Sequence, residues 1–361
     1  MELFNASGAR RRLQASPLFA IGPSEAGPAL RRGFLVAVPV GLALILELGL
    51  DSPSKGAIGT GALLAGFPGM DAPARPRAAW QAAAAPLIGI AAVLGVLTGS
   101  NAFLAIATMA LVGAVAGYCF AVSLRLAIFG LSVALSLLIA QDLPLDLGDA
   151  LPALLLATAG GLLQAAFSLC VWAVGDRAEE GGESGWDWPA ARSALRDNLT
   201  LRSSSFRHGL RFGAALGAGV ALYWLLGIHE HGFWIPLTIL FVMRPQKDET
   251  FRRLALRAIG TAIGLVIATA LAEWLRGDEL AIALCLTIAT GFAYGLLTVQ
   301  YALFTAAITT YAVLLADSIG ETAFHAAGER ALGTALGILI AAAAFLLWPN
   351  PGDDLGDGHA V

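Results

Sequence analysis

The sequence has few charged residues and almost no lysine. Asp, Glu, Lys and Arg make up only 13% of its 361 residues, and the two lysines are Lys55 and Lys247. Neither lysine lies in the G-x-x-x-x-G-K-[ST] pattern of a phosphate-binding loop, which argues against an ATP-driven pump. The H-E-x-x-H and G-x-S-x-G patterns of hydrolases are also missing. We therefore predict a protein that is not an enzyme and uses no cofactor.

Cysteines and metal-ligand patterns are equally scarce. Cys119, Cys170 and Cys285 are isolated within apolar runs, so they predict neither a disulfide framework nor a metal site. The turn His229-Glu230-His231 has two imidazoles and a carboxylate, but no third and fourth ligand follows nearby. We interpret it as a solvated, pH-sensitive turn and predict no bound metal.

Apolar residues dominate the composition instead. They form 57% of the chain, and the mean hydropathy is +0.74, beyond what a soluble chain covers with polar side chains. The apolar runs are long and lack the alternation of barrel strands. We predict an all-α polytopic membrane protein with about twelve transmembrane helices in two six-helix repeats. The expected crossings are 34–50, 56–69, 78–97, 103–119, 124–139, 151–174, 210–228, 232–243, 254–275, 280–296, 301–315 and 324–348.

A polar linker separates the two predicted repeats. It begins with GDRAEEGGESG and continues as DWPAARSALRDNL, which predicts a short surface helix with Asp187 as its cap and Pro189 in its first turn. We divide the chain into a cytoplasmic N-terminal segment (1–33), a first transmembrane repeat (34–174), a cytoplasmic linker (175–206), a second repeat (207–348) and a disordered acidic tail (349–361).

The basic residues predict the orientation. If both termini are cytoplasmic, all but three of the 22 Lys and Arg residues fall on the cytoplasmic side, and the exceptions are Lys55, Arg276 and Arg330. This count holds only if the short segments 56–69 and 232–243 both cross the membrane. The pattern therefore predicts a multi-pass membrane protein with cytoplasmic termini.

The two short segments are the second crossing of each half. Twelve helical residues rise only about 18 Å against roughly 30 Å of hydrocarbon, so neighbouring helices must shelter them. The halves align at a constant offset of 176 residues, which pairs Gly56 with Gly232 and Arg77 with Arg253. Paired short segments in two repeats are typical of transporter binding sites.

A smaller repeat lies inside the second half. R-A-x-G-T-A-x-G begins at Arg257 and again at Arg330, three crossings later, so the second copy has the inverted topology. In the first half the matching positions hold Gln81 and Leu154. We therefore expect the two halves to differ chemically.

The residues around the eighth segment resemble the signature of the fusaric acid resistance family, which is related to aromatic acid exporters. The resemblance covers about 206–348. The residues that carry it are Trp234, Pro236, Thr238, Arg244-Pro245, Thr250, Arg253, Arg257, Gly260-Thr261 and Gly264. It implies a bacterial inner-membrane exporter of small, aromatic carboxylic acids, coupled to protons and in some members assisted by a periplasmic adaptor. The short linker departs from the large cytoplasmic domain that many members carry.

These residues also form the predicted substrate site. We expect Arg257 and Arg330 to receive the carboxylate from opposite faces, with Arg253 nearby and Trp234 stacking on the substrate ring. Three hydroxyls line the expected path, those of Thr238, Thr261 and Thr334.

Each assignment has a structural alternative. Arg253 and Arg257 are also explained as positive-inside anchors, Trp234 as an interfacial residue, and the glycines as close-packing positions. Glu47, the one carboxylate well within the crossings of the first half, is the predicted proton carrier, with a snorkelling side chain as its alternative.

The predicted function is secondary export of small organic anions. An anion channel built on the same six-helix unit and a non-transporting membrane assembly partner stay open as alternatives. The predicted partners are the organic anion, the lipid bilayer and either a periplasmic adaptor or further copies of the chain, with no nucleic acid.

Overall fold

The computed structural model describes residues 23–48, 56–143, 146–175, 188–228, 231–275, 277–318 and 322–349. Within these ranges it is helical, without a strand, which confirms the all-α membrane fold. The first half contains α2 (Pro23–Leu48), α3 (Ala57–Gly66), α4 (Ala74–Gly99), α5 (Ala102–Tyr118), η1 (Cys119–Ala121), α6 (Leu124–Asp142) and α7 (Ala150–Gly175). After α8 (Trp188–Asp197), the second half contains α9 (Ser204–Leu226), α10 (Trp234–Val242), α11 (Lys247–Leu275), α12 (Glu279–Leu296), α13 (Tyr301–Ser318) and α14 (Ala323–Leu347).

The apolar helices fall into two classes of length. Ten helices of the described chain are long and apolar enough to span a membrane. Three α-helices of the described ranges remain: α8 of the linker, and α3 with ten residues and α10 with nine, which are second in each half, at the positions expected from the sequence. Seven residues of α3 and eight of α10 are buried, so neighbouring helices shelter both short elements.

The halves meet through two equivalent helix pairs. α2 packs along α12, and α5 packs along α9; exchanging the halves converts one pair into the other. Inside the halves, α3 packs on α7 as α10 packs on α14, and α4 on α6 as α11 on α13. The packing agrees with the two-fold repeat inferred from the 176-residue offset.

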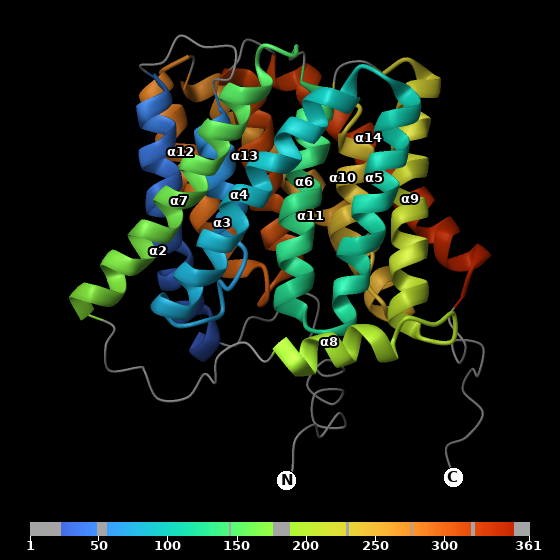
Figure 1. Cartoon of the computed structure of the whole chain (residues 1–361). Coiled ribbons are helices and arrows are strands. Elements are labelled where there is room, and N and C mark those ends of the chain that lie inside the picture. The colour runs from blue at the N-terminus through green and yellow to red at the C-terminus, as the bar shows by residue number, and fades with distance from the viewer. Residues whose placement is uncertain are drawn as a thin grey trace.

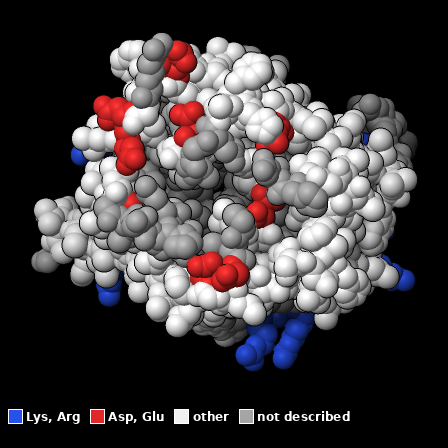
Figure 2. Space-filling view, turned by 90° about the horizontal axis from the view of Figure 1, so that it is seen from above, with Lys and Arg blue, Asp and Glu red and all other residues white. Residues whose placement is uncertain are grey.

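The linker helix and the charges distinguish the two ends of the bundle. α8 lies across the end at which α2 begins (Figure 1), and the Tyr118 hydroxyl donates a hydrogen bond to the Leu195 carbonyl, which fastens it there. The predicted cap Asp187 lies outside the described residues. On the opposite face, acidic side chains gather around the middle and basic ones appear at the margins (Figure 2). We call this face outer, following the predicted orientation.

Small residues bring the central helices of the second half together. A Cβ atom added to Gly264 of α11 would lie 2.7 Å from the Thr309 Cβ of α13. A Cβ added to Gly337 of α14 would lie 2.6 Å from the Thr238 Cβ of α10. The two copies of the R-A-x-G-T-A-x-G motif therefore pack on α13 and α10 in equivalent ways.

We expect Gly337→Ala to lower the thermal stability of the purified protein, because the new methyl group would meet both Thr238 and the Ile235 carbonyl at 2.6 Å. Overpacking of this kind costs about 1–3 kcal/mol. Gly328→Ala on the same helix is the matched control, since nothing lies within 4 Å of its added Cβ. Equal melting temperatures for the two variants would contradict the close packing of α10 and α14.

Candidate functional site

The site is built around two buried arginines of the inverted repeat. Arg257 lies on α11 and Arg330 about two turns into α14, and both side chains are 0% exposed. Among the described residues, none of the three nitrogens of either guanidinium has a hydrogen-bond partner. The Tyr301 hydroxyl lies beside Arg257 but outside hydrogen-bonding geometry, and it donates to the Phe241 carbonyl at 3.1 Å. Two cations are thus enclosed in the bundle.

Both guanidiniums lie against aromatic rings of α10. The Arg330 Cζ is 4.3 Å from the centroid of the Trp234 ring, and the Arg257 Cζ is 5.4 Å from that of Phe241. A desolvated cation–π contact contributes about 2 kcal/mol, less than the cost of burying an unpaired charge. Arg257 is also close enough for its charge to act on Arg330. The pair is therefore an uncompensated positive site.

The carboxylates nearest in sequence have other partners. Glu249 binds Arg252 at 2.9 Å and Arg253 at 2.6 Å. Glu329, next to Arg330 in the chain, contacts His231 at 2.9 Å and His325 at 3.2 Å. The positive charge of Arg257 and Arg330 is therefore available to an anion from outside the chain.

Hydroxyl and indole donors accompany the two arginines. The Oγ1 atoms of Thr261 and Thr334, and the Nε1 atom of Trp234, are buried without a hydrogen-bond partner in the described chain. Thr305 and Thr309 of α13 add two more such hydroxyls. Sequence analysis missed these two threonines, although their four-residue spacing matches that of Gly260 and Gly264, on which they pack.

Two residues of the predicted site, Thr238 and Trp234, already have contacts within the protein. The Thr238 hydroxyl donates to the Trp234 carbonyl at 3.0 Å. The Trp234 ring is 2% exposed and is contacted by Arg330 and by the rings of His231 and Phe233, with centroids 5.5 and 5.4 Å away. This arrangement favours Trp234 as an N–H donor over a stacking platform for a substrate ring.

Arg253 is set apart from the central pair. Its Nε binds Glu249 at 2.6 Å and its guanidinium covers the Tyr301 ring at 4.5 Å, so its charge is compensated. Arg244 closes the turn between α10 and α11, donating from its backbone N–H to Thr250 and from Nη1 to the Met243 carbonyl. Burial, with the nearby charge of Arg253, lowers the pKa of Arg244 to about 9. The Arg-Pro part of the signature therefore shapes the turn below the site.

In the first half, Gln81 replaces Arg257 and belongs to a hydrogen-bonded network with Ser168 and Arg77. Gln81, at the position matching Arg257, is 0% exposed and accepts a hydrogen bond from Ser168 at 2.7 Å. Ser168 in turn accepts from the Nε of Arg77 at 3.3 Å. The expected chemical difference between the halves is present in the structure.

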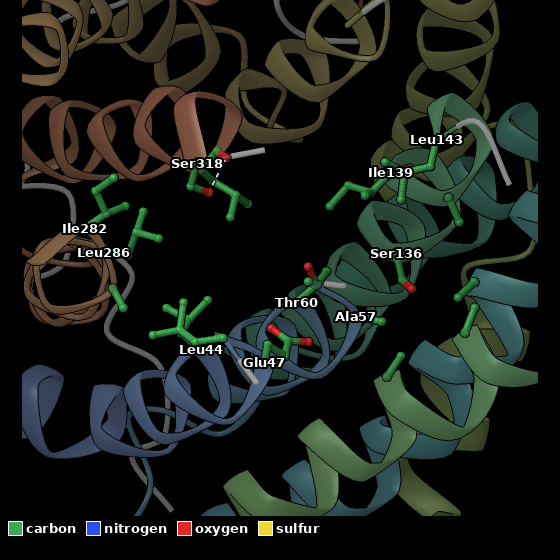
Figure 3. Close-up of a pocket in the computed structure, with 18 of the residues that line it drawn as sticks. Leu44, Glu47, Ala57, Thr60, Ser136, Ile139, Leu143, Ile282, Leu286 and Ser318 are labelled. Carbon is green, nitrogen blue, oxygen red and sulfur yellow. Dashed lines mark hydrogen bonds between the residues drawn. The ribbon is translucent and has the colours of Figure 1, made fainter. Parts of the chain in front are cut away.

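Glu47 lies at a helix end and beside a cavity. Its carboxylate is 3% exposed, and Oε1 accepts from the backbone N–H groups of Ile58 (2.6 Å) and Gly59 (3.2 Å), which caps the N-terminus of the short α3. Figure 3 shows Glu47 and Thr60 at one side of a cavity of about 190 Å³, with Ser318 across from them. The carboxylate thus points into the protein and does not snorkel.

In the absence of any ligand, Arg257→Met should raise the melting temperature, because replacing a buried, unpaired charge by an apolar side chain stabilises proteins by about 1–4 kcal/mol. Arg77→Met is the matched control. It breaks the hydrogen bond to Ser168 and should lower the melting temperature. A fall in stability for Arg257→Met would show that Arg257 is paired within the chain.

Comparison with known proteins identifies the second half. Residues 215–344 match the sequence model of a family described as fusaric acid resistance protein-like. The inner membrane protein YccS of Escherichia coli K12 is 37% identical over 157 residues, which are 43% of this chain and 22% of that protein. An uncharacterized Synechocystis protein is 34% identical over 122 residues, 34% of this chain and 16% of that protein. An uncharacterized Neisseria gonorrhoeae protein is 29% identical over 158 residues, 44% of this chain and 37% of that protein.

These matches cover only part of each relative. The aligned region spans about a fifth of YccS and little more than a third of the Neisseria protein. No solved structure matches the chain. The family model nevertheless covers α10, α11 and nearly all of α14, where the two buried arginines lie. The resemblance predicted from Trp234 to Gly264 is therefore confirmed over residues 215–344, and the chain is a multi-pass membrane protein whose second half is similar to the fusaric acid resistance family.

Proposed function

We propose that the protein is a secondary transporter that exports small organic anions, aromatic carboxylates among them, across the inner membrane in exchange for protons. One observation carries the proposal, namely two fully buried arginines whose charge no described carboxylate neutralises. Uncompensated charges within membrane-spanning helices are costly and mark binding sites for ions or charged substrates.

The donors around the arginines suit a carboxylate. Arg257 and Arg330 each offer guanidinium N–H groups to carboxylate oxygens, a geometry that gives strong charge-assisted hydrogen bonds. Thr261, Thr334 and Trp234 add neutral donors with no partner in the described chain. An anion at this point would satisfy groups that the protein itself leaves unsatisfied.

Enclosure of the site favours alternating access over a channel. Both guanidiniums are 0% exposed, so this conformation screens the centre from both faces. The short helices α3 and α10 are paired in the two halves, the arrangement by which transporters form a central site between repeats. In this proposal, Glu47 is the proton carrier, since it borders the cavity toward the outer face. A periplasmic adaptor or further copies of the chain would complete the export route.

A ligand screen by thermal shift tests the anion site. The anion 4-hydroxybenzoate should raise the melting temperature of the wild type. At a hundredfold excess over Kd, a bound ligand adds about 2.7 kcal/mol to the free energy of unfolding. Arg257→Ala and Arg330→Ala should abolish the shift. Arg252→Ala is the matched control, because Arg252 is half-exposed and paired with Glu249. A shift that survives both central substitutions would place the anion site elsewhere.

Proteoliposomes distinguish the modes of transport. Labelled 4-hydroxybenzoate should cross only where Arg257 is intact, and an imposed pH gradient should change its accumulation, with protein-free vesicles as the leak control. Currents of many ions per opening in planar bilayers would replace the exporter by an anion channel. Transport that ignores the pH gradient would remove proton exchange from the proposal.

A further inference from the structure

A second cluster of titratable groups lies at the outer end of α10. α6 ends at Asp142, whose Oδ1 accepts a hydrogen bond from the Phe233 N–H (3.2 Å) immediately before α10. Glu47 caps α3 in the same manner, so both short helices have a carboxylate at their N-terminus. The cap of α10 differs because it comes from the other half of the protein and because His231 lies close enough to act on it.

The histidines connect this cap to the arginine site. The His231 Nδ1 is 2.9 Å from a Glu329 oxygen, and the His325 Nε2 is 3.2 Å from the other. His231 also packs edge-on against Trp234, with ring centroids 5.5 Å apart, and Trp234 covers Arg330. The Trp234 ring therefore contacts both His231 and Arg330, so that a movement of His231 would alter the packing on Arg330.

The backbone at His231 is held in an unfavourable conformation. Its φ is +57°, the left-handed region that non-glycine residues seldom adopt. The ring contacts with Glu329, Phe233 and Trp234 keep the residue there. Such a residue stays in place only while its side-chain partners hold it, so weakening those contacts favours release of the turn.

Among the described residues, the charged and titratable groups around His231 come from four elements. They are Asp142 of α6, Tyr223 of α9, His231 of the turn itself, and His325, Glu329 and Arg330 of α14. Asp142 and Glu329 lie close enough for negative charges on the two carboxyl groups to act on each other. With both histidines protonated, Glu329 has two cations within 3.2 Å, and the charge of His231 also acts on Asp142. Imidazoles gain their proton in the physiological range, near pH 6.5.

We infer that Asp142, His231, His325 and Glu329 form a proton-binding latch, in which protons taken up from the outer side hold the Trp234 end of α10 closed over Arg330. Loss of these protons lets the two carboxylates repel each other and frees the strained turn. The transport role of the latch rests on the proposed function, because closing by outer protons would follow departure of the anion. The latch itself is measurable without any substrate.

Hydrogen exchange of the purified full chain in detergent tests the latch. Peptides covering 231–242 are followed at about pH 5.5 and pH 8, with rates normalised to the intrinsic exchange rate at each pH. In the wild type, protection of the first turn of α10 should fall about tenfold or more from the acid to the alkaline condition. Protection that is equal at both values, or greater at the alkaline one, would overturn the latch.

Variants assign the effect to the named groups. His231→Gln and Glu329→Gln should each give protection that no longer depends on pH, and either suffices if the other fails to fold. Asp278→Asn is the matched control, because Asp278 caps α12 toward the same face (Oδ1 to the Ala281 N–H, 3.0 Å) and is exposed. It should keep the wild-type response. A wild-type response in His231→Gln would overturn the assignment.

The outcomes separate the latch from the proposed function. A pH-dependent α10 in a protein that neither binds nor moves 4-hydroxybenzoate would leave the latch standing and remove the transport proposal. Transport that depends on Arg257, together with protection of α10 that does not change with pH, would support the proposed function and remove the latch.

Discussion

The cost of enclosing two guanidiniums in a helical bundle governs the design of the second half. Arg257 and Arg330 are completely buried, and the described chain offers them aromatic faces but no carboxylate. Cation–π contacts offset only part of the several kcal/mol that each buried charge costs. The remainder has to come from packing elsewhere or from an anion, which is why we propose this site as the substrate site.

The short helix α10 makes this arrangement possible. Trp234 and Phe241 are seven residues apart, two helical turns, so both rings lie on one face, and each contacts one arginine. A helix of full membrane length would place its ends in the interfaces. With nine residues, α10 instead has its N-terminus at the Asp142 cap and its C-terminus at the Arg244 turn, both within reach of other helices. Its ends are therefore open to control by groups of neighbouring elements.

The two halves depart from symmetry in their buried polar residues. The helix pairs of the halves correspond, yet Gln81 and Ser168 form a hydrogen-bonded network where Arg257 has no partner. Glu47 caps α3 from within its own half, whereas Asp142 reaches α10 from the opposite half. The two halves thus differ at the position of Arg257, while each short helix has a carboxylate at its N-terminus.

The amino-acid sequence by itself determined the membrane class, the order of the helices and the repeated Arg-Gly-Thr motif, because hydrophobic length and local spacing are written directly along the chain. The predicted segment 280–296 and α12 (Glu279–Leu296), for example, differ by one residue. Only the tertiary structure decided what the polar side chains contact. It paired Glu329 with two histidines and not with Arg330, and it paired Arg253 with Glu249. It also packed Thr305 against Gly260 and placed Asp142 at the N-terminus of α10. Those outcomes depend on which helices pack together, which local spacing does not encode.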